Sequence, residues 1–248
     1  MKKQEYNINM FYIKGDKNMK GKLITIEGTD CSGKETQTNL LIKKLREEGY
    51  RVQNFSFPNY NSPTGKIIGG PYLGKDGYDP CYFEEGSSNV DPKVASLYYA
   101  ADRKYNIDKI NFLLERGYNV ILDRYIYSNM AHQGGKLKEK KERLEMYDWL
   151  DKLEFDLMEL PKPDLTIFLH MPVDVAEKLK AHRKEKADGH EKDKNHLYHA
   201  EKAYLELAEK YNFITIECSK NGNPKDIKAI NQIIYKKVKP YMHKLNND

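Results

Sequence analysis

The sequence predicts an α/β fold with a five-stranded parallel sheet and helices on both faces. Five short runs rich in β-branched and apolar residues alternate along the 248-residue chain with stretches of helical periodicity. Strands that alternate with helices form right-handed βαβ units, whose helices cover both faces of the sheet. A glycine-rich loop directly follows the first run, and ligands of such sheets bind beyond the carboxyl ends of the strands.

The predicted strands are the apolar runs at residues 22–27, 51–57, 119–123, 164–170 and 213–218. The clearest predicted helices lie at residues 36–48, 92–115, 142–157, 174–186 and 225–245. Because the carboxyl ends of parallel strands meet at one edge, we expect the residues that follow Glu27, Phe57, Asp123 and His170 to converge on one crevice.

Two segments lack this periodicity. Residues 59–91 are rich in Gly, Pro, Tyr and Asn, and a loop of that length inside a compact domain is usually functional. Residues 1–18 are polar, precede a second methionine at Met19, and are predicted to be a disordered extension, with a translation start placed too early as the alternative. Since no linker signal divides the rest, residues 19–248 are predicted to form a single domain.

Composition narrows the class of function. The net charge of +5 rests on lysine, since only seven of the 42 basic residues are arginine, and no basic stripe or nucleic-acid-binding module accompanies it. No apolar run approaches the ~20 residues of a membrane span, and the N-terminus lacks the pattern of a signal peptide. Three cysteines without paired spacing favour a reducing compartment. We therefore expect a cytoplasmic protein without nucleic-acid or membrane partners.

The loop after the first strand has the spacing of a phosphate-binding P-loop, G-x-x-x-x-G-K. With the two residues that follow it, this loop is the candidate nucleotide site: Gly28, Thr29, Asp30, Cys31, Ser32, Gly33, Lys34, Glu35 and Thr36. The glycines allow consecutive backbone N–H groups to surround phosphate, and the lysine reaches the β and γ oxygens. A chance glycine-rich turn is the alternative, but a strand before the loop and a helix after it favour phosphate binding.

The residue after Lys34 departs from the motif. A P-loop usually has Ser or Thr there to ligate magnesium, whereas this chain has Glu35. A carboxylate is repelled by polyphosphate but attracted by Mg²⁺, so Glu35 either holds the metal, directly or through water, or points to solvent in the first helical turn. Asp30 is not needed to cradle phosphate and would repel it without another partner, such as an arginine or a substrate hydroxyl.

A second candidate group ends the third strand. Asp123 terminates the apolar run and is the type of residue with which P-loop enzymes hold Mg²⁺, usually through water. Arg124 would project into the same crevice, where its planar guanidinium suits a phosphate, with a structural salt bridge as the alternative. Ser128 and Gln133 follow closely and are further candidates for substrate binding.

Together, several stretches resemble the thymidylate kinase family over nearly all of residues 20–241. They are GTDCSGKETQ (28–37), FPNYNSPTGKII (57–68), LYYAADR (97–103), DRYIYSNMAHQGG (123–135), PKPDLTIFLHMP (161–172) and DGHEKDKN (188–195). The resemblance implies a P-loop NTPase fold with a five-stranded parallel sheet and a short lid, usually assembled as a homodimer. The implied reaction uses ATP and Mg²⁺ to convert dTMP to dTDP, with ADP as the second product.

The resemblance also implies roles for individual residues. Asp30 would contact the sugar 3′-hydroxyl and an arginine, and Lys34 would bridge the transferring phosphate. Arg124 would bind the dTMP phosphate, so these three residues would form the catalytic set. Residues 183–196 would be the lid, and Arg183 would close over ATP.

The resemblance further implies that Tyr99 stacks on thymine and that Arg103 donates to its O4. The two residues are four apart and so share one face of a helix, where an aromatic plate beside a donor suits a flat base. A surface cation–π contact or a core pair is the alternative.

Two departures from the family concern the phosphate acceptor. Where many members carry FPxR, with the arginine gripping the monophosphate, this chain has Tyr60, so the contact would move to Lys66 or to the tyrosine hydroxyl. The tyrosine usual in the A-Y-Q segment is His132 here. Another P-loop nucleoside or nucleotide kinase and a non-catalytic nucleotide-binding protein are the alternatives. A deoxynucleoside kinase would need a carboxylate after the second strand, where this chain has Phe57-Pro58-Asn59.

Overall fold

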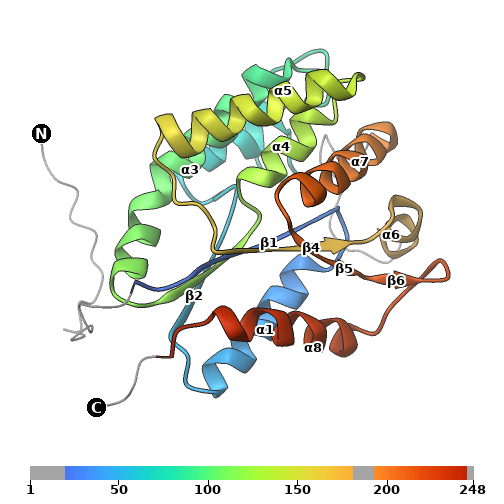
Figure 1. Cartoon of the computed structure of the whole chain (residues 1–248). Coiled ribbons are helices and arrows are strands. Elements are labelled where there is room, and N and C mark those ends of the chain that lie inside the picture. The colour runs from blue at the N-terminus through green and yellow to red at the C-terminus, as the bar shows by residue number, and fades with distance from the viewer. Residues whose placement is uncertain (1–19, 181–192, 245–248) are drawn as a thin grey trace, which may run out of the picture.

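The computed structural model describes residues 20–180 and 193–244. Its main sheet has five parallel strands in the order β2-β3-β1-β4-β5, as Figure 1 shows. The strands are β1 (Leu23–Gly28), β2 (Val52–Ser56), β3 (Asn119–Asp123), β4 (Leu165–His170) and β5 (Ile214–Glu217). The predicted five-stranded parallel sheet is confirmed, and each strand lies within a residue or two of its predicted range.

Helices cover both faces of the sheet (Figure 1), with α3, α4, α5 and α7 on one face and α1 and α8 on the other. Their bounds are α1 (Lys34–Glu47), α3 (Pro92–Glu115), α4 (Ile126–Gly134), α5 (Lys140–Asp151), α6 (Val173–Lys180), α7 (Lys194–Lys210) and α8 (Ile227–Val238). Strand residues alternate between two buried clusters, since Val120 and Leu122 pack on one side and Ile121 on the other. A sheet buried on both faces explains why its strands are continuously apolar.

Four helices differ from prediction. The sequence patterns did not single out α4 or α7, and the short helix α4 begins only two residues after Arg124. The predicted helix at 142–157 begins at Lys140 and ends in a π-helical segment, η2 (Lys152–Leu157). The last helix stops at Val238 and continues only as the short 3₁₀ segment η3 (Lys239–Tyr241), because Pro240 cannot donate to a longer helix.

Residues 59–91, for which no periodicity was expected, contain the short helix α2 (Pro63–Ile67) and a π-helical turn, η1 (Ile68–Tyr72). The buried carboxylate of Asp102 on α3 ties down the start of this segment. It accepts hydrogen bonds from the backbone N–H of Asn59 at 2.8 Å, from Ser62 Oγ at 2.9 Å and from Thr64 Oγ1 at 2.7 Å. The segment is therefore built onto α3, which borders the crevice.

The middle of this segment is held by aromatic packing. Tyr72 is fully buried, donates its hydroxyl to the carbonyl of Ser87, and contacts the rings of Phe83, Tyr98 and Tyr99. Aromatic side chains supply large buried areas and so order a segment with little regular structure. Both anchors hold residues 59–91 against the start of α3.

Two short strands, β6 (Ser219–Lys220) and β7 (Asn223–Pro224), form an antiparallel hairpin before α8.

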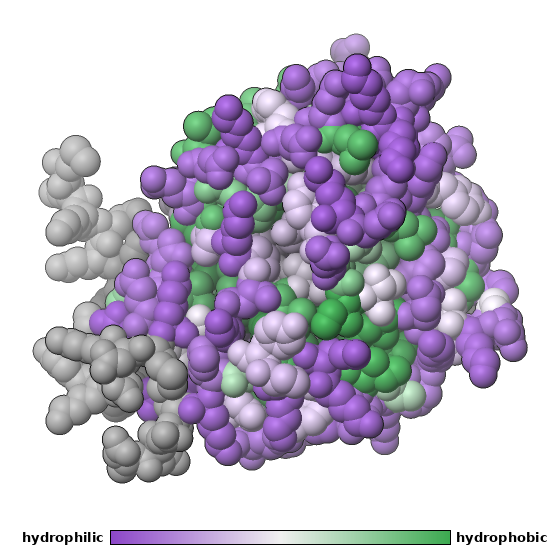
Figure 2. All heavy atoms as spheres, in the orientation of Figure 1, coloured by the Kyte–Doolittle hydropathy of each residue, from purple (hydrophilic) through white to green (hydrophobic). Residues whose placement is uncertain are grey.

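Figure 2 shows that hydrophilic side chains cover most of the face in view, with hydrophobic patches between them. Within the described ranges, no helix is long and apolar enough to cross a membrane. The predicted extension at 1–18 and most of the predicted lid at 183–196 lie outside the described residues.

Candidate functional site

A cavity of about 610 Å³ lies at the carboxyl edge of the sheet, where the sequence predicted a crevice. Residues that follow β1, β2 and β3 line it, together with α3 and the segment at 59–91. The expected site residues that line it are Asp30, Cys31, Gly33, Lys34, Glu35, Thr36, Tyr60, Tyr99, Arg103, Asp123, Arg124, Ser128 and Gln133.

Other expected site residues lie elsewhere. Gly28, Thr29 and Ser32 belong to the same loop but do not line the cavity. Lys66 is exposed on α2 and is not part of the lining, whereas Lys75, which no sequence pattern indicated, does line it. Arg183 falls outside the described residues.

The loop between β1 and α1 depends on its two glycines. A Cβ on Gly28 would lie 2.7 Å from Ser32 Oγ and 2.8 Å from the carbonyl oxygen of Leu169, closer than real Cβ contacts allow. Gly33 has a φ of 81°, in the left-handed region that favours glycine, and α1 begins at the next residue. The chain therefore turns tightly from the strand into the helix, with the helix N-terminus facing the cavity.

Lys34 is buried beneath this loop. Its Nζ donates to the carbonyl oxygens of Gly28 at 3.0 Å and Thr29 at 2.8 Å. Burial, followed by the positive charge of Arg124, lowers the pKa of Lys34 to about 8. The nearby carboxylates raise the pKa of Lys34 by less than burial lowers it. An anion bound in the cavity would therefore stabilise the charged form of Lys34.

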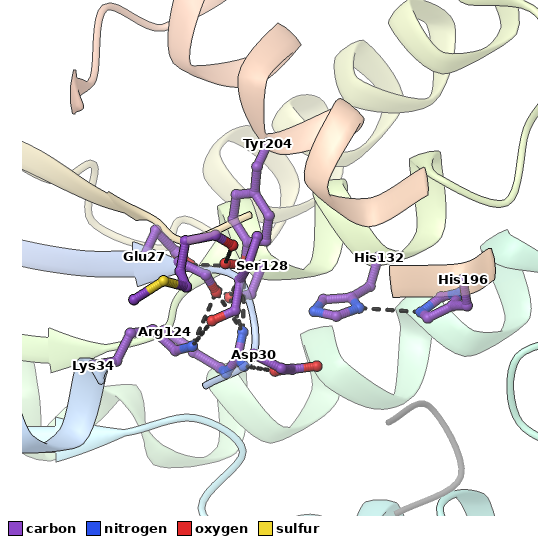
Figure 3. A network of polar contacts seen from close by, with 11 residues as sticks. Glu27, Asp30, Lys34, Arg124, Ser128, His132, His196 and Tyr204 are labelled. Atoms are coloured by element: carbon purple, nitrogen blue, oxygen red, sulfur yellow. Dashed lines mark hydrogen bonds and ion pairs between the residues drawn. The ribbon is translucent and has the colours of Figure 1, made fainter. Parts of the chain in front are cut away.

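Arg124 lies directly after β3 with a φ of 66°, a left-handed conformation that is uncommon for a residue with a side chain. Figure 3 shows its guanidinium between the phosphate loop and α4. Nη2 forms an ion pair with Asp30, while Nη1 donates to the Gly28 carbonyl, to Ser128 Oγ and to the Tyr204 hydroxyl, each at 3.3 Å. Burial alone would lower the pKa of Arg124, but the carboxylates led by Asp30 raise it, so the side chain stays charged.

Glu27 is a buried residue of this network that was not among the predicted site residues. One carboxylate oxygen accepts from the backbone N–H of Tyr125 at 2.8 Å, and the other accepts from Ser128 Oγ at 2.5 Å (Figure 3). Burial raises the pKa of Glu27. Its signal in the sequence was a charged residue at the end of an otherwise apolar strand, directly before the glycine-rich loop. Glu27 holds the backbone that follows Arg124 and thereby orients the turn.

Arg103 and Asn129 form a second polar group in the cavity lining. Arg103 on α3 is buried and paired with Glu154, and the amide nitrogen of Asn129 on α4 donates to the same carboxylate. The amide oxygen of Asn129 and both amide atoms of Gln133 are buried without a hydrogen-bond partner among the described residues. Buried polar atoms of this kind are normally satisfied, so a water molecule or a polar ligand would complete them. Asn129 was missed because nothing in its sequence context distinguishes it from a solvent-facing helical residue.

Tyr99 also lines the cavity, and its ring meets the buried ring of Tyr72 edge-on at 5.7 Å between centroids. His132 lines the cavity too, and its Nδ1 lies 3.1 Å from Nε2 of His196 at the start of α7, as Figure 3 shows. The residue that departs from the family pattern is thus joined to the start of α7, where His196 is the last residue of the predicted lid.

The two expected metal ligands both line the cavity. Asp123 is half-buried at the end of β3 and exerts a charge effect on Lys34, whereas Glu35 is exposed in the first turn of α1. Within residues 20–180 and 193–244, no three His, Cys, Asp or Glu side chains cluster as a preformed metal site. A hard cation would therefore need oxygen ligands from a bound phosphate as well, which is how Mg²⁺ is usually held in nucleotide sites.

The buried position of Lys34 leads to a prediction about stability. Because folding lowers its pKa from 10.5 to about 8, the unfolded chain binds more protons between these values, and stability rises with pH through that window. Below pH 8 the cost of burying the charge is fully present. Lys34→Met should therefore raise the free energy of unfolding there, by up to about 3 kcal/mol less the two lost hydrogen bonds.

Urea denaturation of both proteins, without nucleotide, measures this difference. The gain should shrink as the pH rises from about 8 towards 10.5. Lys43→Met, at an exposed position of the same helix, is the matched control and should show no such pH dependence. A Lys34→Met effect that stays constant across this range would contradict the assigned burial cost.

Comparisons with known proteins agree with this geometry. A sequence model of the thymidylate kinase family matches residues 26–229. The chain is 32% identical to the thymidylate kinase of Plasmodium falciparum over 170 residues, which cover 68% of this chain and 71% of that protein. It is 30% identical to the human thymidylate kinase over 167 residues, or 67% and 69% of the two chains. A solved structure of thymidylate kinase from Candida albicans superposes with a TM-score of 0.68 and 26% identity, covering 92% of this chain and 96% of that one. With the parallel sheet and the phosphate loop, these similarities show that the chain belongs to the thymidylate kinase family and is an ATP-dependent kinase that phosphorylates dTMP.

Proposed function

We propose that one cavity binds both substrates, with the ATP phosphates on the loop at residues 28–34 and dTMP against Tyr99, Arg103 and Arg124. The observation that carries this proposal is that Lys34, the Arg124–Asp30 pair and the polar side chains of Arg103 and Asn129 all line the same cavity. Phosphoryl transfer needs mainly positioning and charge stabilisation. Lys34 and Arg124 would supply the positive charge, and Asp30 would orient the arginine.

The proposed base site favours thymine on hydrogen-bonding grounds. Arg103 offers donors only, and the Asn129 amide oxygen is an acceptor, because its nitrogen already donates to Ser96 and Glu154. Thymine presents a C4 oxygen beside an N3–H, so it matches a donor beside an acceptor. Cytosine presents the inverse pattern, with an exocyclic amine beside a bare N3. Tyr99 would supply an aromatic surface for the ring.

A coupled assay with ATP, Mg²⁺ and a panel of acceptors tests this assignment. We expect kcat/KM to be much lower for dCMP than for dTMP or dUMP, because a site built for one hydrogen-bond pattern strongly rejects the other. Thymidine should not be phosphorylated, since the chain offers no carboxylate base after β2. Equal rates with dTMP and dCMP would contradict the proposed base contacts.

We infer that Lys75 and Tyr60 take the place of the arginine that many family members carry after the second strand. Lys75 Nζ lies 4.8 Å above the Tyr60 ring, and both side chains line the cavity. The backbone N–H of Lys75 donates to the carbonyl of Gly69 at 2.8 Å, so the residue is anchored to the turn of η1. A lysine held in this way would bring positive charge to the dTMP phosphate.

Two lysine variants separate this proposal from the expectation for Lys66. Lys75→Ala should raise the KM for dTMP about tenfold, the size expected for one lost charged hydrogen bond, with the KM for ATP unchanged. Lys66→Ala removes the same charge from an exposed position outside the cavity lining and should leave both constants unchanged. Initial-rate measurements over both substrate concentrations decide between them. The reverse outcome would return the phosphate contact to Lys66.

We also propose that the reaction uses Mg²⁺, which Asp123 and Glu35 would hold together with ATP oxygens. The carboxylates of both residues line the cavity beside the phosphate loop, and oxygen ligands suit this hard cation. When bound, Mg²⁺ would neutralise part of the phosphate charge. The alternative for Glu35, a solvent-facing residue that only interacts with the helix dipole, is supported by its exposure.

A magnesium titration of three proteins decides the role of Glu35. If its carboxylate holds the metal, Glu35→Gln should raise the Mg²⁺ concentration needed for half-maximal rate and lower kcat. Glu35→Ser, which restores the hydroxyl usual in this motif, should preserve or increase activity. If Glu35 faces solvent, the loss should instead be at most about 1 kcal/mol of stability. Superimposable titration curves for all three proteins would exclude it from the metal site.

The assembly is proposed to be a homodimer that contacts through α3. Val94, Leu97, Tyr105 and Phe112 lie along one side of this helix and are each 40–48% exposed, an unusual density of large apolar side chains for a surface helix. Sedimentation velocity of the full chain tests this assembly, and a single-chain mass at micromolar concentration would contradict it.

We propose that the protein is cytoplasmic. The three cysteines form no disulfide, which supports this location, and the distribution of a tagged full-length chain would test it. We propose that the partners are small molecules rather than nucleic acid or membrane.

Two predictions about the chain stay open to test. Residues 19–248 are predicted to form one domain, and residues 183–196 to form a lid whose Arg183 closes over ATP. Limited proteolysis with and without ATP would test both.

A further inference from the structure

Glu154 is a fully buried carboxylate that the reaction itself does not require. It lies in η2, the π-helical segment that continues α5, and its side chain is 0% exposed. A buried carboxylate is costly unless it is paired and hydrogen-bonded. π-helical segments change the direction of side chains relative to an α-helix and occur frequently at functional sites. Its position therefore calls for a reason beyond packing.

The first partner of Glu154 is Arg103, which lines the cavity. Arg103 Nε donates to Oε2 at 2.5 Å and Nη2 donates to Oε1 at 2.6 Å. This two-point contact fixes the plane of the guanidinium as well as its position. The arginine is itself only 2% exposed, and within the described ranges its guanidinium donates hydrogen bonds to this carboxylate alone.

The second partner is Asn129, which also lines the cavity. Its Nδ2 donates to Glu154 Oε1 at 3.1 Å and to the carbonyl oxygen of Ser96 at 3.2 Å. Both amide hydrogens are thereby directed to acceptors, which fixes the amide so that Oδ1 is the remaining polar atom. That oxygen is buried and has no hydrogen-bond partner within the described ranges.

We propose that Glu154 is the positioning residue that sets pyrimidine selectivity, because it orients the Arg103 donor and the Asn129 acceptor at the same time. The inference rests on the proposed base site and adds the residue that defines its hydrogen-bond pattern. Glu154 does not touch the base. It acts through two residues on different helices, α3 and α4, which it joins from a third.

Stability alone accounts poorly for this arrangement. Buried ion pairs often contribute little, because the cost of removing both charges from water offsets their attraction. The chain also contains a comparable pair away from the cavity. Arg143 Nε and Nη2 donate to Glu206 at 2.8 Å and 2.7 Å, and neither residue lines the cavity. This second pair is a matched control for the loss of a two-point arginine–carboxylate contact.

Glu154→Gln tests the proposal, with Glu206→Gln as its control. The substitution keeps the shape of the side chain but introduces an NH₂ group. In the Oε2 position this group faces the Arg103 Nε donor and breaks the two-point contact that orients the guanidinium. In the Oε1 position it faces Arg103 Nη2 and the Asn129 amide nitrogen, so Asn129 must turn its own nitrogen towards the cavity. We expect the ratio of kcat/KM for dTMP to that for dCMP to fall by about tenfold or more. The KM for ATP should stay unchanged, and Glu206→Gln should keep both the selectivity and the KM values.

The possible outcomes separate this inference from the proposed function. A wild-type chain without preference for dTMP over dCMP would contradict the base site itself. A folded Glu154→Gln protein that keeps the wild-type ratio of kcat/KM for dTMP to that for dCMP, whether or not both values fall, would overturn the positioning role alone. If that variant does not fold, Glu154→Asp, which retains the charge but withdraws the carboxylate, is measured in the same way. It should also lose selectivity, and an unchanged ratio would count against the proposal.

Discussion

The ion pair between Arg124 and Asp30 joins the two loops on which the site depends. Asp30 lies in the loop after β1 and Arg124 in the turn after β3, and these strands are neighbours in parallel register, with Ile26 beside Asp123. Parallel pairing brings both carboxyl ends to one edge of the sheet. The left-handed backbone of Arg124 turns its side chain back over the phosphate loop, and the buried Glu27 holds the chain that follows. The loop, the turn and the start of α4 therefore form one unit.

This unit contains charges that are only partly compensated by the protein. Burial lowers the pKa of Lys34 and raises that of Glu27, so folding disfavours the charged form of each. A site with buried, partly compensated charges lowers the stability of the fold in return for function. The apolar clusters on both faces of the sheet offset this loss of stability. Phosphate groups of ATP and dTMP are the anions that such a site would bind most favourably.

The proposed base site is built differently, from contacts between helices rather than from strand ends. Arg103 lies on α3, Asn129 on α4 and Glu154 on η2, and one carboxylate joins all three. The segment at 59–91 closes the same region through its anchors on α3 and brings Lys75 to the lining. In the proposed binding mode, charge would therefore govern the phosphate side of the cavity, and hydrogen-bond direction the base side.

The sequence alone determined the parts whose physics is local. Five apolar runs predicted the strands, and the spacing of Gly28, Gly33 and Lys34 predicted the phosphate loop, because a tight turn between strand and helix needs those residue types at those positions. The crevice followed from the geometry of parallel sheets. Helix α4 was missed because nine residues hold too few periods to give a clear pattern.

The tertiary structure decided which side chains share the cavity. Glu154 lies 51 residues from Arg103, and nothing in its local sequence marks it as a partner. Lys75 rather than Lys66 reaches the lining because aromatic packing and a π-helical turn set the path of residues 59–91, and neither has a sequence period. Contacts between distant residues depend on how helices pack. The sequence therefore determined which chemistry is present, and the packing decided where each group lies.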